Sequence, residues 1–221
     1  MIVNQVLAAV KLFFMFPKIE LIISKLELNF ASIPSPRKQK LIELAAQLKL
    51  ALSSANALNL LFVCTHNSRR SHMGQVWGQL AANYYEVENT NSFSAGTEVT
   101  ELNSNVIEML QKVGCKVSTF QNVSNPAYLI EFGENQSLTC FSKLIEHESN
   151  PNAGFFAIMM CTEAEANCPF VPGAIHRIGL PFDDPKAYDN TLKVSDAYLS
   201  TFEEIGLQIL FLFNQIKHDN Y

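Results

Sequence analysis

One segment of the sequence combines a thiol with two guanidinium groups and several small polar side chains. It runs Cys64-Thr65-His66-Asn67-Ser68-Arg69-Arg70-Ser71, and it follows a continuous apolar run and precedes a helical pattern. In such a loop, successive backbone N–H groups can point toward one position, and the start of the next helix adds positive potential. A tetrahedral oxyanion fits that position, so this segment is a candidate anion-binding loop.

The side chains of this loop suit a reaction at sulfur. Arg70, six residues after Cys64, can close over a bound anion with two parallel hydrogen bonds. A thiolate is favoured in such a setting, and Ser71 can donate to it. Asn67 tolerates the left-handed backbone that a tight turn requires. We therefore expect Cys64 to be a nucleophile and the rest of the loop to bind the oxyanion (Thr65, His66, Asn67, Ser68, Arg69, Arg70, Ser71). The alternative is a structural cysteine at a strand end beside solvated arginines.

Two further cysteines, Cys161 and Cys168, enclose six residues. A zinc site fits poorly, because the spacing is wrong and His176 is the only nearby partner, so we expect no metal. The pair can be two buried core cysteines or a redox pair. If the segment is helical, seven positions span about 10.5 Å, whereas a disulfide needs Cα atoms about 4.4–6.8 Å apart. A bond between them therefore requires the segment to unwind or loop out.

The elements that must hold these residues alternate between strand and helix. Short buried apolar runs at 60–63, 155–160 and 175–180 predict parallel strands, with a further strand at 92–95. Helical periodicity covers 71–84, 103–113 and 195–217, and residues 128–132 and 138–141 predict a hairpin. We expect a doubly wound three-layer α/β/α domain over residues 57–221, with a central four-stranded parallel sheet. Cys64 and Cys161 both end a strand, where ligands of such sheets bind.

Composition excludes several classes of protein. The chain has 221 residues, of which 48% are apolar and 17% charged, so it is neither disordered nor collagen-like. A net charge of −5, without a run of basic residues longer than two, argues against nucleic-acid binding. No apolar run reaches 18 residues, so we expect no membrane span. Five cysteines fit reduced thiols in a cytoplasmic protein better than a secreted disulfide scaffold.

The first 56 residues read as a helical extension of the α/β domain. Helical patterns occupy 18–28 and 36–52, separated by a break at 32–36. Residues 1–17 are apolar but carry Asn4, Gln5 and Lys11, which fits a frayed helix or an upstream extension of a chain that begins at Met15 better than it fits a signal peptide.

The loop resembles the phosphate-binding loop of the low-molecular-weight protein tyrosine phosphatases and the thioredoxin-coupled arsenate reductases that share their fold. The reductases carry Cys-Thr-Gly-Asn-Ser-Cys-Arg-Ser, and this chain differs by His66 for Gly and Arg69 for Cys. We expect the His66 side chain to face solvent. The resemblance covers about residues 57–217, and the N-terminal helices and the hairpin insertion at 127–142 lie outside the family's minimal pattern.

The resemblance implies roles for the remaining residues. Asp184, which Pro185 follows, matches the late Asp-Pro acid that protonates the leaving oxygen, whereas Asp183 is a loop residue. The Cys-x6-Cys-Pro segment resembles the redox segment of the reductases, which the phosphatases lack. The implied relay begins with Cys64 attacking arsenate. Cys161 then attacks Cys64 and releases arsenite, Cys168 attacks Cys161, and thioredoxin reduces the resulting disulfide. No cofactor is bound in this scheme.

Three functions remain open at this point. Arsenate reduction through Cys64, Cys161 and Cys168 is favoured because all three cysteines and Asp184 are in place. Hydrolysis of phosphate esters, as in a tyrosine phosphatase, needs only Cys64, Arg70 and Asp184, and the two activities can coexist. The third is an oxyanion-binding redox sensor whose N-terminal helices bind a partner.

Overall fold

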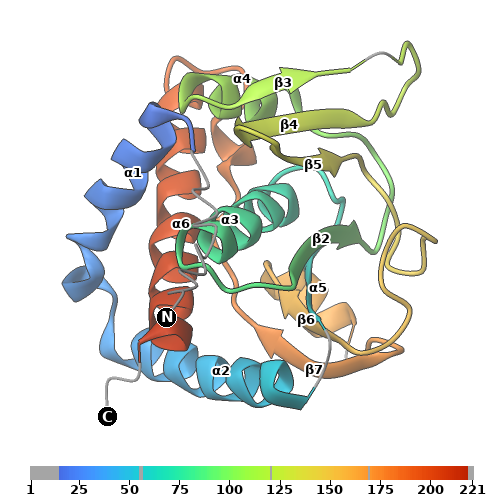
Figure 1. The fold of residues 1–221 in the computed structure, drawn as a ribbon. Coiled ribbons are helices and arrows are strands. Elements are labelled where there is room, and N and C mark those ends of the chain that lie inside the picture. Colours follow the sequence, from blue (N-terminus) through green and yellow to red (C-terminus); the bar gives the residue numbers. More distant parts are fainter. Residues whose placement is uncertain (1–14, 55–56, 120, 169, 219–221) are drawn as a thin grey trace, which may run out of the picture.

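Four parallel strands form the central sheet of the molecule, in the order β2-β1-β6-β7 (Figure 1). Their bounds are Leu58–Cys64 (β1), Thr90–Gly96 (β2), Phe155–Met159 (β6) and Ala174–Gly179 (β7). The computed structural model describes residues 15–54, 57–119, 121–168 and 170–218. Strands β1 and β6 lie in the middle and are buried almost throughout, as their continuous apolar sequences predict. The expected four-stranded parallel sheet is confirmed.

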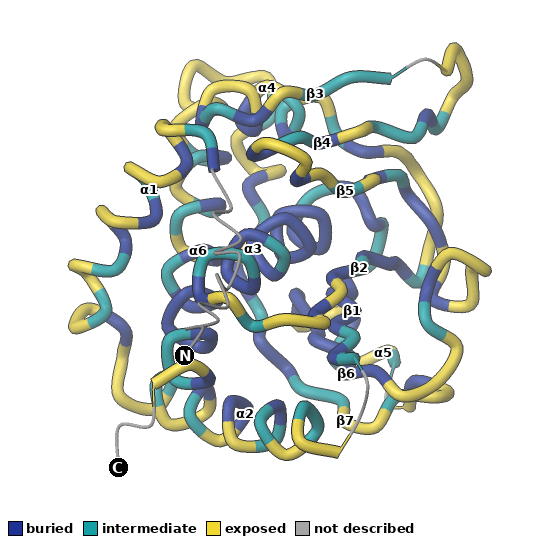
Figure 2. Tube along the Cα trace, viewed as in Figure 1, coloured by how far each residue is buried: buried dark blue, intermediate teal, exposed yellow. Residues whose placement is uncertain are grey.

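Helices flank this sheet. Helix α3 (Arg70–Tyr84) packs on β1 and β2, and the long helix α6 (Val194–Lys217) packs on α3. Figure 2 shows α3 as the most completely buried helix, and the Trp77 indole donates to the Phe202 carbonyl oxygen of α6 at 2.8 Å. The shorter helices α4 (Ser104–Lys112) and α5 (Thr162–Asn167) contact α6 and the β1–β6 pair, respectively. A 3-10 turn, η2, covers Pro185–Tyr188.

The N-terminal helices pack on the same core. Helices α1 (Pro17–Glu27) and α2 (Ser35–Ser54), joined through a 3-10 turn η1 (Phe30–Ser32), both contact α6. One carboxylate fixes α1 to α3, because Glu27 accepts from the hydroxyls of Tyr84 at 2.8 Å and Tyr85 at 2.5 Å. The helical character of this region is confirmed. The division of the chain at residue 56 stays a prediction, and the alternative starts at Met1 and Met15 concern residues 1–14, which lie outside the described residues.

The expected hairpin belongs to a second, antiparallel sheet. Strands β4 (Tyr128–Gly133) and β5 (Gln136–Cys140) pair as a hairpin, and Asn135 has the positive φ of 56° that its tight turn requires. A strand that the sequence pattern did not reveal, β3 (Lys116–Ser118), pairs on the other side of β4. Three residues are too few to show a periodic pattern, which explains the omission.

The described part of the chain contains no helix that is both long enough and apolar enough to cross a membrane.

Candidate functional site

The Cys64–Ser71 loop connects the carboxyl end of β1 to the start of α3. The carbonyl oxygens of six consecutive residues, 64–69, each accept a hydrogen bond from a group of a neighbouring segment or of α3. Their donors are Thr97 N, Glu98 N, Thr100 Oγ1 with Ser142 Oγ, His72 Nε2, Asn103 N and Met73 N, in that order. Because the C=O and N–H of one peptide unit point in opposite directions, the N–H groups of residues 65–70 point the other way. The loop therefore presents a set of backbone donors, as an anion site requires.

Cys64 lies at the base of this loop and is only 4% exposed. Its Sγ is 3.1 Å from Ser71 Oγ, and Ser71 Oγ accepts from Asn67 Nδ2 at 2.8 Å. With that acceptor position filled, the Ser71 hydroxyl hydrogen is free to point at the sulfur. Asn67 has φ of 44°, the left-handed backbone expected from the sequence. Gly96 of β2 passes so close that a Cβ there would lie 2.7 Å from the Asn67 nitrogen, so only glycine fits.

A histidine beneath the loop fixes the turn at Asn67. His72 is fully buried, and its Nε2 lies 2.8 Å from the Asn67 carbonyl oxygen. Since a carbonyl only accepts, Nε2 carries the hydrogen, and Nδ1 faces Ser94 Oγ at 3.1 Å. Burial lowers the pKa of His72 to about 3, and the nearby Lys143 ammonium adds to this effect. His72 is therefore a neutral support of the loop.

Arg70 and Asp184 meet on the other side of the loop. Arg70 Nη2 donates to Asp184 Oδ2 at 2.6 Å, and Nη1 donates to the Phe182 carbonyl oxygen at 2.9 Å. The Arg70 Nε is buried and has no acceptor among the described residues, so one donor of the guanidinium is free for an anion. Asp184 Oδ1 accepts from Lys186 N at 3.0 Å. The structure thus brings the expected arginine and acid together at the end of the loop that Cys64 begins.

Arg69, which the sequence analysis placed in the oxyanion-binding set, directs its side chain to other residues. Its Nη2 pairs with Asp189 Oδ2 at 2.8 Å, and its Nε donates to the Tyr198 hydroxyl at 2.7 Å. Asp189 also accepts from Tyr198 and from Asn105 Nδ2. The Arg69 guanidinium therefore connects the loop to the segment after Asp184. Only the main chain of Arg69 remains available to bind an anion at the loop.

Three other loop residues make contacts outside the Cys64–Asp184 cluster. The His66 side chain is 43% exposed, and its Nε2 lies 3.4 Å from Glu98 Oε2, so it faces outward as expected. Ser68 is buried, and its carbonyl oxygen accepts from Asn103 N at 3.1 Å. Thr65 faces the next strand end, where its Oγ1 lies 3.5 Å from Cys161 Sγ and donates to Glu163 Oε2 at 3.2 Å.

Cys161 and Cys168 lie at the two ends of α5 and are both free thiols. Cys161 is buried, and its Sγ accepts from Ala164 N at 3.4 Å, which caps the start of the helix. Cys168 is half-buried, and its carbonyl oxygen accepts from Arg177 Nε at 2.6 Å. The helical geometry considered from the sequence is therefore the one present, and a Cys161–Cys168 bond requires α5 to unwind.

The other two cysteines belong to the packed interior. Burial raises the pKa values of the Cys115 and Cys140 thiols to about 12, so both stay protonated at neutral pH. Within the described ranges, no group of three or more His, Cys, Asp and Glu side chains is arranged to hold a metal ion.

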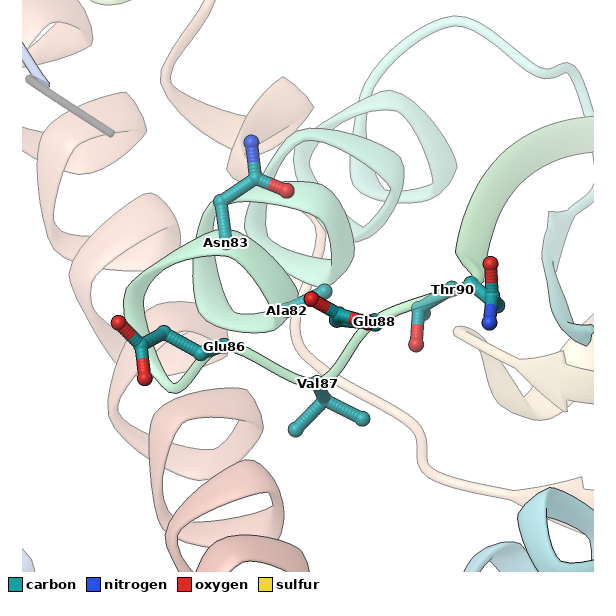
Figure 3. Close-up of a pocket in the computed structure, with 7 residues that line it drawn as sticks. Ala82, Asn83, Glu86, Val87, Glu88 and Thr90 are labelled. Carbon is teal, nitrogen blue, oxygen red and sulfur yellow. The ribbon is translucent and has the colours of Figure 1, made fainter. Parts of the chain in front are cut away.

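A surface cavity of about 230 Å³ lies at the far end of α3, away from the anion loop (Figure 3). It is lined by Ala82, Asn83, Glu86, Val87, Glu88, Asn89 and Thr90. Helix α3 has 15 residues, or about 22 Å, between its two ends. The two glutamates also make the cavity unsuitable for an oxyanion, so it is not part of the candidate site.

The chain is similar over most of its α/β part to bacterial arsenate reductases. It is 27% identical over 156 residues to the arsenate reductase of Bacillus cereus (strain Q1), a match that covers 68% of this chain and 98% of that protein. It is 28% identical to the arsenate reductase of Brevibacillus brevis with the same coverage, and 26% identical over 145 residues to arsenate reductase 2 of Staphylococcus epidermidis, covering 64% and 91%. These matches support the resemblance to the arsenate reductases that the loop motif suggested. The sequence relatives thus support an enzyme of this fold.

Solved structures of the family resemble the chain more distantly. A low-molecular-weight phosphotyrosine phosphatase from Vibrio cholerae O395 is 18% identical, with a TM-score of 0.48, and the match covers 75% of this chain and all of that one. A thioredoxin-dependent arsenate reductase from Corynebacterium glutamicum is also 18% identical, with a TM-score of 0.43 and coverage of 90% and 96%. No family profile matches the chain.

Sequence reasoning missed the residues that hold the site from outside the loop. His72 belongs to no recognisable motif in the sequence, although its position directly after Ser71 is a usable signal. Asp189 and Tyr198 reach Arg69 from more than 100 positions away, and Arg37 of α2 contacts the segment before Asp184. No local pattern marks such long-range contacts.

Proposed function

We propose that this enzyme reduces arsenate to arsenite, with thioredoxin as the electron donor. One observation supports this choice over hydrolysis: a second thiol, Cys161, lies beside the loop, with its Sγ 3.5 Å from the hydroxyl of Thr65, the residue after Cys64. The β1–β6 pairing, in which Val63 faces Met159, brings these two strand ends together. Ester hydrolysis at Cys64 has no use for that thiol, whereas a reductive relay depends on it.

The first step forms a bond between sulfur and arsenic. Backbone N–H groups of residues 65–70 and the Arg70 Nε bind the arsenate oxygens, and the Cys64 thiolate attacks arsenic. Asp184 supplies a proton to the departing oxygen, which leaves as water. Arg70 holds the Asp184 carboxyl at 2.6 Å before the anion arrives, so the acid is already oriented toward the loop.

The second step transfers electrons from sulfur to arsenic. The Cys161 thiolate attacks Cys64 Sγ, a disulfide forms, and the electron pair of the broken S–As bond reduces As(V) to As(III), which leaves as arsenite. Cys168 then attacks Cys161, which frees the Cys64 thiolate and leaves a Cys161–Cys168 disulfide for thioredoxin to reduce. This last exchange requires α5 to unwind.

Parallel assays of cysteine variants test the proposal. Arsenate-dependent oxidation of reduced thioredoxin should be lost in Cys64→Ser, Cys161→Ser and Cys168→Ser, and should persist in Cys115→Ser, which alters a buried thiol outside the site. Repeated turnover of arsenate by Cys168→Ser would contradict the relay.

Hydrolysis of phosphate esters is the second candidate. It is favoured by the separation of Cys161 and Cys168 across α5, since hydrolysis needs neither thiol. Aryl-phosphate hydrolysis should be abolished in Cys64→Ser and retained in Cys168→Ser. A wild-type enzyme that hydrolyses aryl phosphates but does not reduce arsenate would make hydrolysis the main function.

A further inference from the structure

Arg37 reaches the acid-bearing segment from the N-terminal helix α2. Its Nη2 donates to the carbonyl oxygen of Pro181 at 2.5 Å, across 144 positions of sequence. Its guanidinium carbon also lies 5.1 Å from the centre of the Phe182 ring, within the range of a cation–π contact. Arg37 therefore touches two successive residues that end two positions before Asp184.

Phe182 is held from both sides by arginines. Arg37 lies over its ring, while Arg70 Nη1 donates to its carbonyl oxygen at 2.9 Å, and the side chain is only 5% exposed. Arg70 belongs to the anion loop, and Arg37 belongs to α2. Through Phe182 the two arginines fix the direction in which the chain enters Asp184.

The surroundings of Arg37 are acidic. Burial lowers the pKa of Arg37, and the carboxylates of Glu204 and Glu165 act in the opposite direction. Burial and the nearby Asp183 raise the pKa of Glu204, and Arg37 opposes this shift. Removal of the Arg37 charge would leave the repulsion between Asp183 and Glu204 without this opposing cation. Asp183 is the residue directly before the proposed acid, so this repulsion would act on the same segment.

We propose that Arg37 is a positioning residue, through which helix α2 holds the Asp184 carboxyl in its place for proton transfer. This role rests on the proposed function of Asp184 as the acid. A proton donor must lie about 2.6–3.2 Å from the oxygen it protonates, and a misplacement of about 1 Å can lower a rate by about 100-fold. A restraint two residues away is therefore enough to matter.

Substrates with different leaving groups test this role. Phenyl phosphate has a basic leaving oxygen that needs the acid, whereas 4-nitrophenyl phosphate has a leaving group that departs with little help. In Arg37→Met, kcat/KM for phenyl phosphate should fall about 10-fold, and kcat/KM for 4-nitrophenyl phosphate should fall less than about 2-fold. The 10-fold loss is smaller than the 10²–10⁴-fold loss expected when a general acid is removed altogether, because Asp184 is still present. Arg37→Lys, which keeps the charge, should recover part of the loss. Lys40→Met removes a charge from the exposed part of the same helix and should match wild type for both esters.

Hydrogen exchange gives a readout that needs no substrate. The Lys186 amide donates to Asp184 Oδ1, so its exchange reports on the placement of the acid. Exchange of the Lys186 amide should be about 5-fold faster in Arg37→Met and unchanged in Lys40→Met.

The outcomes separate this role from the proposed function. An active wild type whose Arg37→Met variant matches it in exchange and in leaving-group dependence overturns the role of Arg37 alone. Equal losses for both esters also overturn it, because a general loss of folded protein does not discriminate between leaving groups. A wild type that turns over neither arsenate nor either ester overturns the proposed function, and the role of Arg37 falls with it.

Discussion

The segment that carries Asp184 and the segment that carries Cys161 and Cys168 are held in different ways. The acid segment, residues 181–189, is contacted by three arginines from two places in the chain: Arg37 at Pro181, Arg70 at Phe182 and Asp184, and Arg69 at Asp189. The redox segment, Cys161–Cys168, is a short helix whose start is capped by the Cys161 sulfur itself. At its other end, Arg177 donates to the carbonyl oxygens of Glu165 and Cys168.

This difference matches what the proposed chemistry asks of each segment. Proton transfer requires an acid at a fixed distance from the leaving oxygen. Charged hydrogen bonds at both ends of the acid segment hold the acid in a fixed position. A Cys161–Cys168 bond requires the chain to change shape, because the α5 helix separates the two Cα atoms by about 10.5 Å. A six-residue helix has few internal hydrogen bonds to break, so its unwinding is feasible. The rigid segment therefore serves the first step, and the adaptable segment serves the last.

Among changes in the acid segment, replacement of Asp184 should lower the reaction rate most. Asp184→Asn removes the proton that the leaving oxygen needs, so kcat/KM for phenyl phosphate should fall about 10²–10⁴-fold. Asp183→Asn is the matched control and should change this value less than about 3-fold, because a neighbour that only lines the loop donates no proton. Thermal unfolding of both variants verifies that each one is folded. A larger loss in Asp183→Asn than in Asp184→Asn would show that Asp183, and not Asp184, is the acid.

The sequence predicted the local features of the site because they depend on short-range chemistry. The turn at Asn67, the Ser71–Cys64 contact and the strand-loop-helix setting all arise within eight residues. The parallel strands were also predictable, since buried strands read as continuous apolar runs.

The supports of the site were not predictable, for a physical reason. Arg37 meets Pro181 only because α2 packs on α6, and no spacing within the sequence records that packing. The Arg69 side chain was expected at the anion, yet it contacts a carboxylate and a hydroxyl from distant segments. The helical state of residues 162–167 is a third example, because the sequence allowed both a helix and an open turn there.

A change of pH should test the support beneath the anion loop, because His72 makes the free energy of unfolding depend on pH. His72 is neutral in the folded protein, where its pKa is about 3, whereas in the unfolded chain a histidine takes a proton below about pH 6.5. Between these values the unfolded state binds one more proton, so acid favours unfolding and the contribution of His72 is lost progressively as pH falls below 6.5. The free energy of unfolding should drop by about 1.4 kcal/mol per pH unit from this group, or about 2 kcal/mol between pH 6.5 and 5.

Denaturant unfolding of a variant isolates this contribution. His72→Gln removes the titrating group, so its unfolding free energy should fall less steeply between pH 6.5 and 5 than that of wild type. His176→Gln alters an exposed histidine of β7 and should keep the wild-type slope. Equal slopes in wild type and His72→Gln would mean that His72 is already protonated in the folded state.

The Arg69–Asp189 pair should show measurable coupling, because both side chains are shielded from water. They are 12% and 22% exposed and 2.8 Å apart. A double-mutant cycle with Arg69→Met and Asp189→Asn should give a coupling energy of about 1 kcal/mol in unfolding free energy. The surface pair Lys217–Glu86, at 3.5 Å with side chains 41% and 65% exposed, is the control. Its coupling should stay within a few tenths of a kcal/mol. Equal coupling in the two pairs would remove Arg69 from the set of anchors.

The smallest effect is expected where the redox segment is restrained. Arg177→Met removes the donors that reach the carbonyl oxygens of Glu165 and Cys168, so the end of α5 should open more often. With oxidised glutathione as the oxidant, the Cys161–Cys168 disulfide should form about 3-fold faster, the change expected when a hydrogen bond worth about 0.5–1.5 kcal/mol is lost. Mass spectrometry after alkylation measures the rate, and Arg177→Lys, which keeps one donor, should lie between the two. A slower rate in Arg177→Met would show that Arg177 brings the two cysteines together. The redox segment would then be positioned by an arginine, as the acid segment is by three arginines.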